Sequence, residues 1–327
     1  MEPPATAASE TAVTREGLEA HIATVERGVT QPLAGIFGPD SVSWKINRES
    51  ALFLGAGRAA LLQLAHPWVA AALDQHSSLL EKPIARFHNT FRVVFTMVFG
   101  SAGQAFRASR SLHQLHATIR GEIPNAIAGY KKGAPYEANQ IPALCWVFAT
   151  LVESAVVAYE CVLPPLTAQQ RNAYFAEAKT LAALFGIPDE ALPADWSSFT
   201  AYIADMCNSQ ALGVSDRSRY MAHRLLAGSG SRIHPPHWYR ALTTDWLPLR
   251  FRDEFGLAFN PQVEQAARKA HQWLPRIYTK LPATFRFVGP YHAACARLDH
   301  RAPGFITRRS NQFWIGQPKM PFTEVNR

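Results

Sequence analysis

Histidines are the residues of this chain best suited to metal or cofactor chemistry, and the 327-residue sequence contains twelve of them. A neutral imidazole ligates a metal through one ring nitrogen while a hydrogen bond orients the other nitrogen. His113 and His116 lie three residues apart in a stretch of helical periodicity, so a two-histidine metal site is geometrically possible. The stretch 102–120 contains no Asp or Glu, which argues against a Glu-x-x-His di-iron site.

A haem b pocket is the second kind of site that these residues could form. Such a pocket needs one axial nitrogen for iron and cationic side chains for the two propionates. His116 and Arg120 are four residues apart, which predicts that both face one side of a single helix. Arg86 and Thr90 have the same spacing in the preceding helical stretch. Spacing alone leaves open the commoner case, a histidine that is simply hydrogen-bonded within the core.

Helices are the elements that must position these side chains. Apolar residues recur at intervals of three and four, whereas strand-like alternation is nearly absent, so the sequence predicts an all-α fold. We expect a single helical domain over 31–300, a flexible leader over 1–30 and a C-terminal coil or tail over 301–327. The predicted helical windows are 49–73, 84–99, 102–121, 141–163, 167–185, 196–211, 217–226 and 261–280.

The composition indicates a large core and excludes several classes of protein. Hydrophobic residues make up 48% of the chain and charged residues 18%, which is not the composition of a disordered chain. The net charge is +8, but Lys and Arg are scattered, so nucleic acid is not an expected partner. The four cysteines are far apart, which disfavours a disulfide framework. No secretory signal pattern is present at the N-terminus, and we expect a cytoplasmic protein.

Two apolar stretches have alternative interpretations. The stretch 141–165 is long enough to span a membrane, but Glu153 and Glu160 within it favour a buried core helix. The run from Gly55 to Ala60 fits the G-x-G-x-x-A pattern of dinucleotide-binding proteins. No strand is predicted before it and no alternating strand and helix pattern follows, so we interpret these glycines as sites of close helix packing.

Several motifs together resemble a large bacterial and fungal family of oxygenases, the family of mpaB and rubber oxygenase (latex clearing protein). The resemblance extends over about 37–211, with a looser match to about residue 298. The motifs that carry it lie at 65–70 (AHPWVA), 75–77 (QHS), 83–90 (PIARFHNT), 99–100 (FG), 116–121 (HATIRG), 136–139 (YEAN) and 146–154 (WVFATLVES).

The resemblance implies an all-helical fold around haem b and the use of O2 to cleave a carbon–carbon double bond in an isoprenoid. By motif, His116 matches the proximal iron ligand of the family, with Arg120 beside it to pair a propionate. Arg86 and Thr90 match the Arg-x-x-x-Thr pair that lies over the haem. The expected partners are therefore O2 and a hydrophobic small molecule.

One position departs from the family pattern. Rubber oxygenases have a lysine immediately before the threonine, able to occupy the distal iron position, whereas this chain has Asn89 before Thr90. An asparagine cannot supply the amine ligand, which leaves the distal position to water, O2 or His88. A smaller hydrophobic substrate is therefore favoured over rubber. The pair Arg92 and Thr96 has the same spacing, so this second frame stays open.

Two further functions remain open at this stage. A non-haem metal enzyme would use His113 and His116 together with His66 or His76. A non-catalytic carrier would hold haem or a lipid in the same cavity without consuming O2. We expect His66 to cap or bridge helices through its ring nitrogens and His76 to lie at the distal side of the pocket.

Overall fold

The computed structural model describes residues 12–77, 79–230 and 234–322. Helices form most of this part of the chain, with one short antiparallel hairpin, so the predicted all-α class is confirmed. The helices are α1 (Arg15–Arg27), α2 (Val42–Asn47), α3 (Ala56–Leu64), α4 (Pro67–His76), α5 (Pro83–Phe99), α6 (Ala102–Ala117), α7 (Ile141–Val162), α8 (Ala168–Leu184), α9 (Trp196–Asn208), α10 (Asp216–Leu226), α11 (His237–Asp245), α12 (Leu249–Glu254), α13 (Pro261–Tyr278), α14 (Ala283–Arg286), α15 (Gly289–Leu298) and α16 (Phe305–Ile315). The strands are β1 (Arg120–Glu122) and β2 (Pro135–Glu137), and three short 3-10 helices are η1 (Pro32–Ala34), η2 (Ser50–Gly55) and η3 (Asp189–Ala191).

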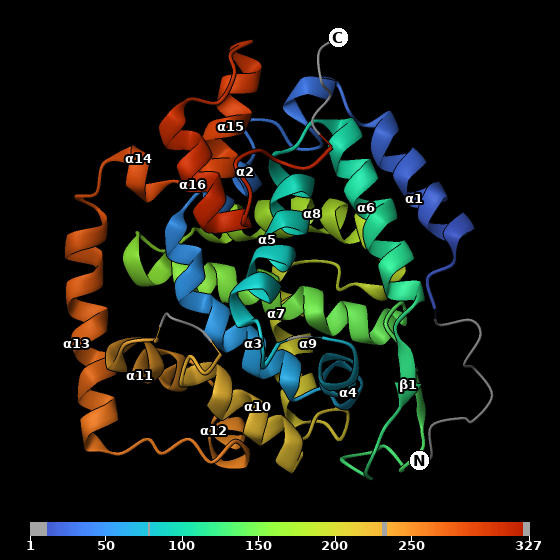
Figure 1. Ribbon diagram of the computed structural model, residues 1–327, viewed down its shortest axis with the longest axis vertical. Coiled ribbons are helices and arrows are strands. Elements are labelled where there is room, and N and C mark those ends of the chain that lie inside the picture. Colours follow the sequence, from blue (N-terminus) through green and yellow to red (C-terminus); the bar gives the residue numbers. More distant parts are fainter. Residues whose placement is uncertain (1–11, 78, 231–233, 323–327) are drawn as a thin grey trace.

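Helix α7 crosses the middle of the molecule, with α3 and α5 in front of it (Figure 1). It is long and apolar enough to span a membrane, but most of its side chains are buried in the core, against α3, α8 and α13. The indole of Trp146 is fully buried and donates a hydrogen bond to the carbonyl of Leu62 over 2.9 Å. The helix therefore takes the core position that its two glutamates predict.

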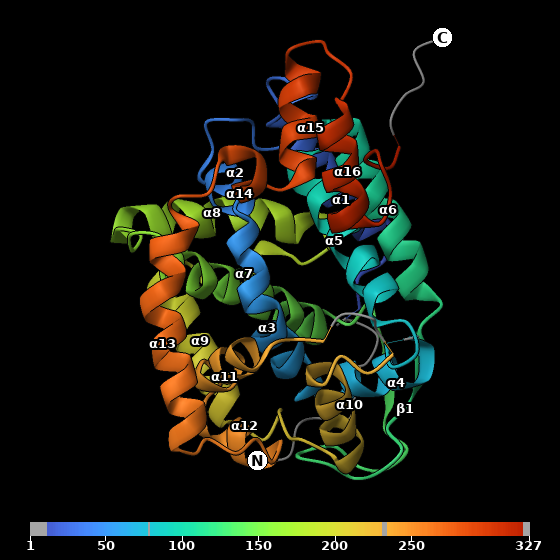
Figure 2. The same ribbon diagram turned by 60° about the vertical axis from the view of Figure 1, so that its left-hand side comes forward.

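The pair α5 and α6 positions the candidate site. The two helices lie side by side, and they are joined by a two-residue turn in which Ser101 caps α6 (Figures 1 and 2). The Ser101 hydroxyl accepts from the Gln104 amide, and the Gln104 side chain accepts in return from the Ser101 amide over 2.9 Å. Because the turn reverses the chain, the beginning of α5 lies beside the end of α6.

Two predicted helical windows differ from the helices that the structure contains. The window 49–73 divides into η2, α3 and α4, because Pro67 disfavours helical geometry at His66 and starts a new helix. The window 102–121 ends at Ala117, because β-branched Thr118 and Ile119 are poor helix formers and the next residues pair with β2. Arg120 thus lies opposite Glu137 in a hairpin.

Both predicted terminal segments contain a helix instead of coil alone. The expected leader contains α1, in which Thr14 caps the first turn and Leu18 and Ile22 are buried against the core. The expected C-terminal coil contains α16, which packs on α5 and α15 through Ile315. The rest of the two predicted segments includes residues 1–11 and 323–327, which lie outside the described part of the chain.

The two glycines of the G-x-G-x-x-A pattern lie where helices approach closely, as predicted. A Cβ atom at Gly55 would lie 2.5 Å from the carbonyl oxygen of Ser154 on α7. A Cβ atom at Gly57 would lie 2.6 Å from the hydroxyl of Thr243 on α11. Both distances are impossible for a larger residue, so the pattern serves helix packing.

Candidate functional site

His116 lies in the last turn of α6 and is partly buried. Burial, followed by the nearby positive charge of Arg86, lowers the pKa of His116 to about 4, against a smaller opposing contribution from Asn139. At neutral pH the imidazole is therefore neutral and carries a free lone pair. A neutral, partly buried imidazole is the form that binds iron.

Arg86 lies near the beginning of α5 and faces the end of α6. Its side chain is partly buried, and burial lowers the pKa of the guanidinium. No side chain or carbonyl in the described ranges forms a hydrogen bond or ion pair with this guanidinium. A cation withdrawn from water without a counter-charge costs free energy. The arrangement is thus suited to an anion that is not part of the chain.

Thr90 stands one helical turn after Arg86. Its hydroxyl donates to the carbonyl of Arg86 over 3.1 Å, so the proton is used within α5 and the oxygen can still accept a hydrogen bond. The alternative pair is engaged elsewhere. Arg92 donates from Nε to the carbonyl of Ile315 over 3.0 Å, and Thr96 is fully buried. The second frame therefore holds α16 against α5, whereas Arg86 of the first frame lies near His116.

Arg120 is not on the same helix as His116, so the prediction that the two share one helical face is wrong. Helix α6 ends at Ala117, and Arg120 is an exposed residue of β1. Its guanidinium donates to the carbonyl of Ala117 over 3.1 Å. This contact caps the helix C-terminus, and a part for Arg120 in cofactor binding stays a prediction.

Three other histidines use a ring nitrogen to hold the fold together. His113 contacts the carbonyl of Val13 at 3.0 Å, His76 that of Arg120 at 3.0 Å, and His88 that of Phe313 at 2.9 Å. A carbonyl only accepts, so each of these Nε2 atoms carries a proton. Within the described residues, no group of three or more His, Cys, Asp or Glu side chains is close enough to hold a metal ion.

His66 has no capping contact, contrary to expectation. It is the N-cap residue of α4 and only 2% exposed, yet its ring makes no capping hydrogen bond and its buried Nδ1 has no partner. Burial lowers the pKa of His66 to about 4, so the ring is neutral at neutral pH. The neighbouring Trp68 ring lies 5.7 Å away, and its Nε1 is also buried without a partner.

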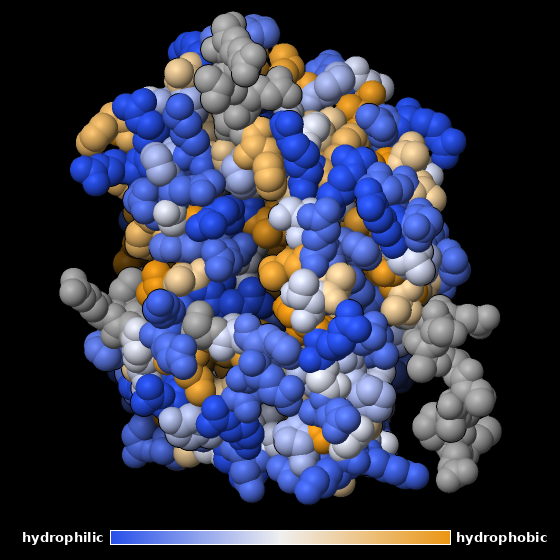
Figure 3. Space-filling view, turned by 45° about the vertical axis from the view of Figure 1, so that its right-hand side comes forward, coloured by the Kyte–Doolittle hydropathy of each residue, from blue (hydrophilic) through white to orange (hydrophobic). Residues whose placement is uncertain are grey.

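Four partly buried aromatic rings pack together where η2, α5 and α16 meet. Phe53 from η2 packs against Phe87 and Phe91 of α5, with centroid distances of 5.1 and 4.4 Å, and stacks on Trp314 of α16 at 4.0 Å. In the space-filling view of Figure 3, hydrophobic side chains lie among hydrophilic ones near the middle of the face. We call Phe53, Phe87, Phe91 and Trp314 the aromatic wall. The sequence analysis missed it, because Trp314 belongs to a segment that was expected to be coil.

The sequence of residues 44–278 matches the family described as ER-bound oxygenase mpaB/B′ and rubber oxygenase, catalytic domain. This match covers well over half of the chain. The protein belongs to the mpaB/rubber oxygenase family. The resemblance seen in the motifs is thereby confirmed, and membership of an oxygenase family supports an oxidoreductase. No curated protein and no solved structure matches the chain.

The oxygenase-family segment contains most, but not all, of the candidate site. His116, Arg86 and Thr90 lie within it, as does the α5 part of the aromatic wall. Helix α16 lies beyond its end and contributes Trp314. This chain therefore completes the wall with a helix from outside the segment that matches the family.

Proposed function

We propose that this protein is a haem b-dependent oxygenase that uses O2 to cleave, or otherwise oxidise, a carbon–carbon double bond in a hydrophobic, isoprenoid- or lipid-like substrate. The observation that carries the proposal is that neutral His116 lies near Arg86, whose guanidinium has no partner among the described residues. The chain also belongs to a family of oxygenase catalytic domains. Each helix of the α5 and α6 pair supplies one of the two groups.

The residues at this site fit haem b in three respects. His116 offers a neutral nitrogen, which iron requires. Arg86 offers a positive charge without a counter-ion, which a propionate carboxylate would neutralise. The aromatic wall offers apolar surface for a flat ring or a hydrocarbon chain. Iron alone would account for the first feature only.

Bound haem would supply the redox chemistry with O2. The chain would supply the other requirements. His116 would hold the iron, and Arg86 would pair the propionate and fix the orientation of the ring. Thr90 would accept a hydrogen bond from a bound group, and the aromatic wall would orient the alkene and exclude water.

Two side chains on α5 bear on the choice of substrate. Asn89 is exposed and cannot replace the lysine of the rubber oxygenases. His88 uses Nε2 for the carbonyl of Phe313, and its ring packs beside Gly316 at the end of α16, so it is a poor candidate for the distal ligand. We therefore propose that neither Asn89 nor His88 would bind the iron, and that the substrate is smaller than rubber.

The first experiment is a visible absorption spectrum of the purified protein with a pyridine haemochrome assay. We expect a Soret band and about one haem per chain. Oxygen uptake is then followed with a series of isoprenoid alkenes. Haem binding without any alkene-dependent O2 consumption would favour the carrier function, and a protein that stays colourless after expression with added haem would overturn the proposal.

A further inference from the structure

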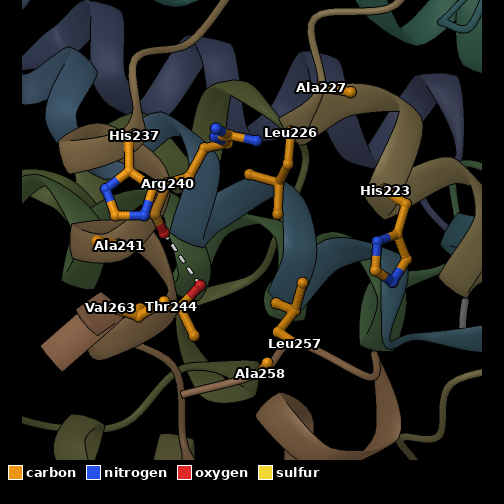
Figure 4. A pocket seen from close by; sticks show the side chains of 10 residues that line it. All are labelled: His223, Leu226, Ala227, His237, Arg240, Ala241, Thr244, Leu257, Ala258 and Val263. Carbon is orange, nitrogen blue, oxygen red and sulfur yellow. Dashed lines mark hydrogen bonds between the residues drawn. The ribbon is translucent and has the colours of Figure 1, made fainter. Parts of the chain in front are cut away.

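A concave site lies away from the α5 and α6 pair, among α10, α11 and the first turn of α13 (Figure 4). Its volume is about 320 Å³, which is large enough for a small molecule. The residues that line it are His223, Leu226, Ala227, His237, Arg240, Ala241, Thr244, Leu257, Ala258 and Val263.

One face of α11 forms a wall of this pocket, and its side chains change from basic to small along the helix. His237, Arg240, Ala241 and Thr244 follow the i, i+3, i+4, i+7 pattern of a single helical face. The basic side chains come first and the small ones follow. The Thr244 hydroxyl donates to the carbonyl of Arg240 over 3.0 Å, so its proton is already used (dashed line in Figure 4).

The remaining walls are mostly apolar. Leu226 and Leu257 lie between His237 and His223 in the view of Figure 4, with Val263 at the α13 side. His223 has its Nε2 bonded to the carbonyl of Phe255 at 2.8 Å. Because the His223 Nε2 is used by Phe255, the lining combines apolar side chains with Arg240 and His237 on one side, which suits an amphiphilic anion.

The charges of the pocket are not balanced by the chain. None of the lining residues is Asp or Glu. Neither the guanidinium of Arg240 nor the ring of His237 has a hydrogen bond or ion pair within the part of the chain that the structure describes. The ion pairs around it involve other residues, such as His271 with Asp245. Arg240 is exposed, and its guanidinium at the edge of the pocket has no counter-charge among the described residues.

We propose that this pocket binds a small carboxylate with a short apolar chain. The carboxylate would accept hydrogen bonds from Arg240 and His237, a geometry that a guanidinium favours. The apolar chain would contact Leu226, Leu257 and Val263. This site is separate from the proposed haem site and requires none of its residues.

The test uses the full-length protein and sodium octanoate as the probe, titrated by calorimetry. We expect saturable binding that weakens at least about tenfold in Arg240→Gln, because a charge-assisted hydrogen bond is lost. The matched control is Arg276→Gln, an exposed arginine on α13 outside the lining, which should bind octanoate like the parent protein. The neutral alcohol 1-octanol and the short anion acetate should each bind more weakly than octanoate.

A second variant tests the location independently of charge. Ala258 is exposed in the loop after α12, so Ala258→Trp would fill the mouth of the pocket without disturbing the core, and octanoate binding should be lost. Equal binding by the parent, Arg240→Gln and Ala258→Trp proteins, or no saturable binding by the parent, would overturn the proposal. Because binding is measured directly, the result does not depend on whether the protein contains haem.

Discussion

Two partly or fully buried arginines show how differently this fold treats a positive charge. Arg58 on α3 is 5% exposed and fully engaged: it donates to Glu153 over 2.7 Å, to Ser154 over 2.9 Å and to the carbonyl of Trp246 over 3.0 Å. Arg86 on α5 has no such partner in any described segment. The first arginine ties three elements together. The guanidinium of Arg86 carries the same charge without such bonds in the described segments. We therefore interpret Arg58 as a residue that stabilises the core and Arg86 as a candidate for ligand binding.

The histidines of α6 repeat the contrast within one helix. His113 is tied to the carbonyl of Val13, whereas His116, three residues later, is neutral and lies beside the unpaired Arg86. The spacing of His113 and His116 in the sequence does not tell the two apart. Their different environments in the packed structure do: one histidine supports the fold, and the other is available to bind a cofactor.

The largest expected effect comes from removing His116, the proposed iron ligand. His116→Ala should lose haem, from about one per chain to near zero, because the imidazole that would hold the iron is removed. Haem content is measured by the haemochrome assay, and folding by circular dichroism. The matched control is His113→Ala, which should keep its haem. Full haem occupancy in a folded His116→Ala protein would remove His116 from the site and leave His66 as the next candidate.

The next prediction compares how Arg58 and Arg86 affect the free energy of unfolding of the haem-free protein. Arg58→Met should lower the free energy of unfolding by about 3 to 5 kcal/mol, because Glu153 is left without its counter-charge. Arg86→Met should leave the stability unchanged or raise it, because it removes a cation that has no partner. Urea denaturation measures both values. Comparable losses in the two variants would mean that Arg86 has a stabilising partner.

The neutral histidines predict a dependence of stability on pH. Burial lowers the pKa of His66 to about 4, below its unfolded value of 6.5, so the unfolded chain binds the proton more readily between these values. The stability that this histidine contributes is therefore complete above pH 6.5 and is lost as the pH falls towards 4. Between pH 7 and pH 5 the loss should be about 2 kcal/mol.

The measurement is a pair of urea denaturation curves at the two pH values, for the parent protein and for His66→Gln. The variant should lose about 2 kcal/mol less than the parent on acidification, since glutamine does not titrate. His116→Gln in haem-free protein should behave in the same way. Identical pH dependence in parent and variants would show that the pKa values of these rings are the same in the folded and the unfolded chain.

Much of the fold could be predicted because its signals are local. The side chain of Thr167 caps α8 and that of Asp195 caps α9, and each cap involves only the three residues that follow it. The end of α6 could not be predicted in this way. It depends on β1 pairing with β2 some 15 residues later, with Gly121 opposite Tyr136.

The candidate site was predictable in its parts and not in its arrangement. The motifs gave His116 and Arg86, but their proximity follows from the packing of α5 against α6, which no local pattern specifies. The aromatic wall needs Trp314 from α16, a helix with Arg and Ser between its apolar residues and with Pro and Gly before its first turn. Such a segment has little helical signal of its own, and its burial against α5 stabilises it.

The smallest expected effect is the difference in haem affinity between variants of Arg86 and Arg120, the two arginines that the motifs assign to haem. Arg86→Gln should weaken haem binding markedly, because its partly buried charge lies beside His116. Arg120→Gln should weaken it less, because Arg120 is exposed, and an exposed ion pair contributes only about 0 to 1 kcal/mol. Haem titration at low and high salt measures both, and added salt should reduce the contribution of Arg120 more than that of Arg86. A larger loss from Arg120→Gln would indicate that β1 turns towards the haem when it binds, which would place Arg120 back beside His116 as the motif implies.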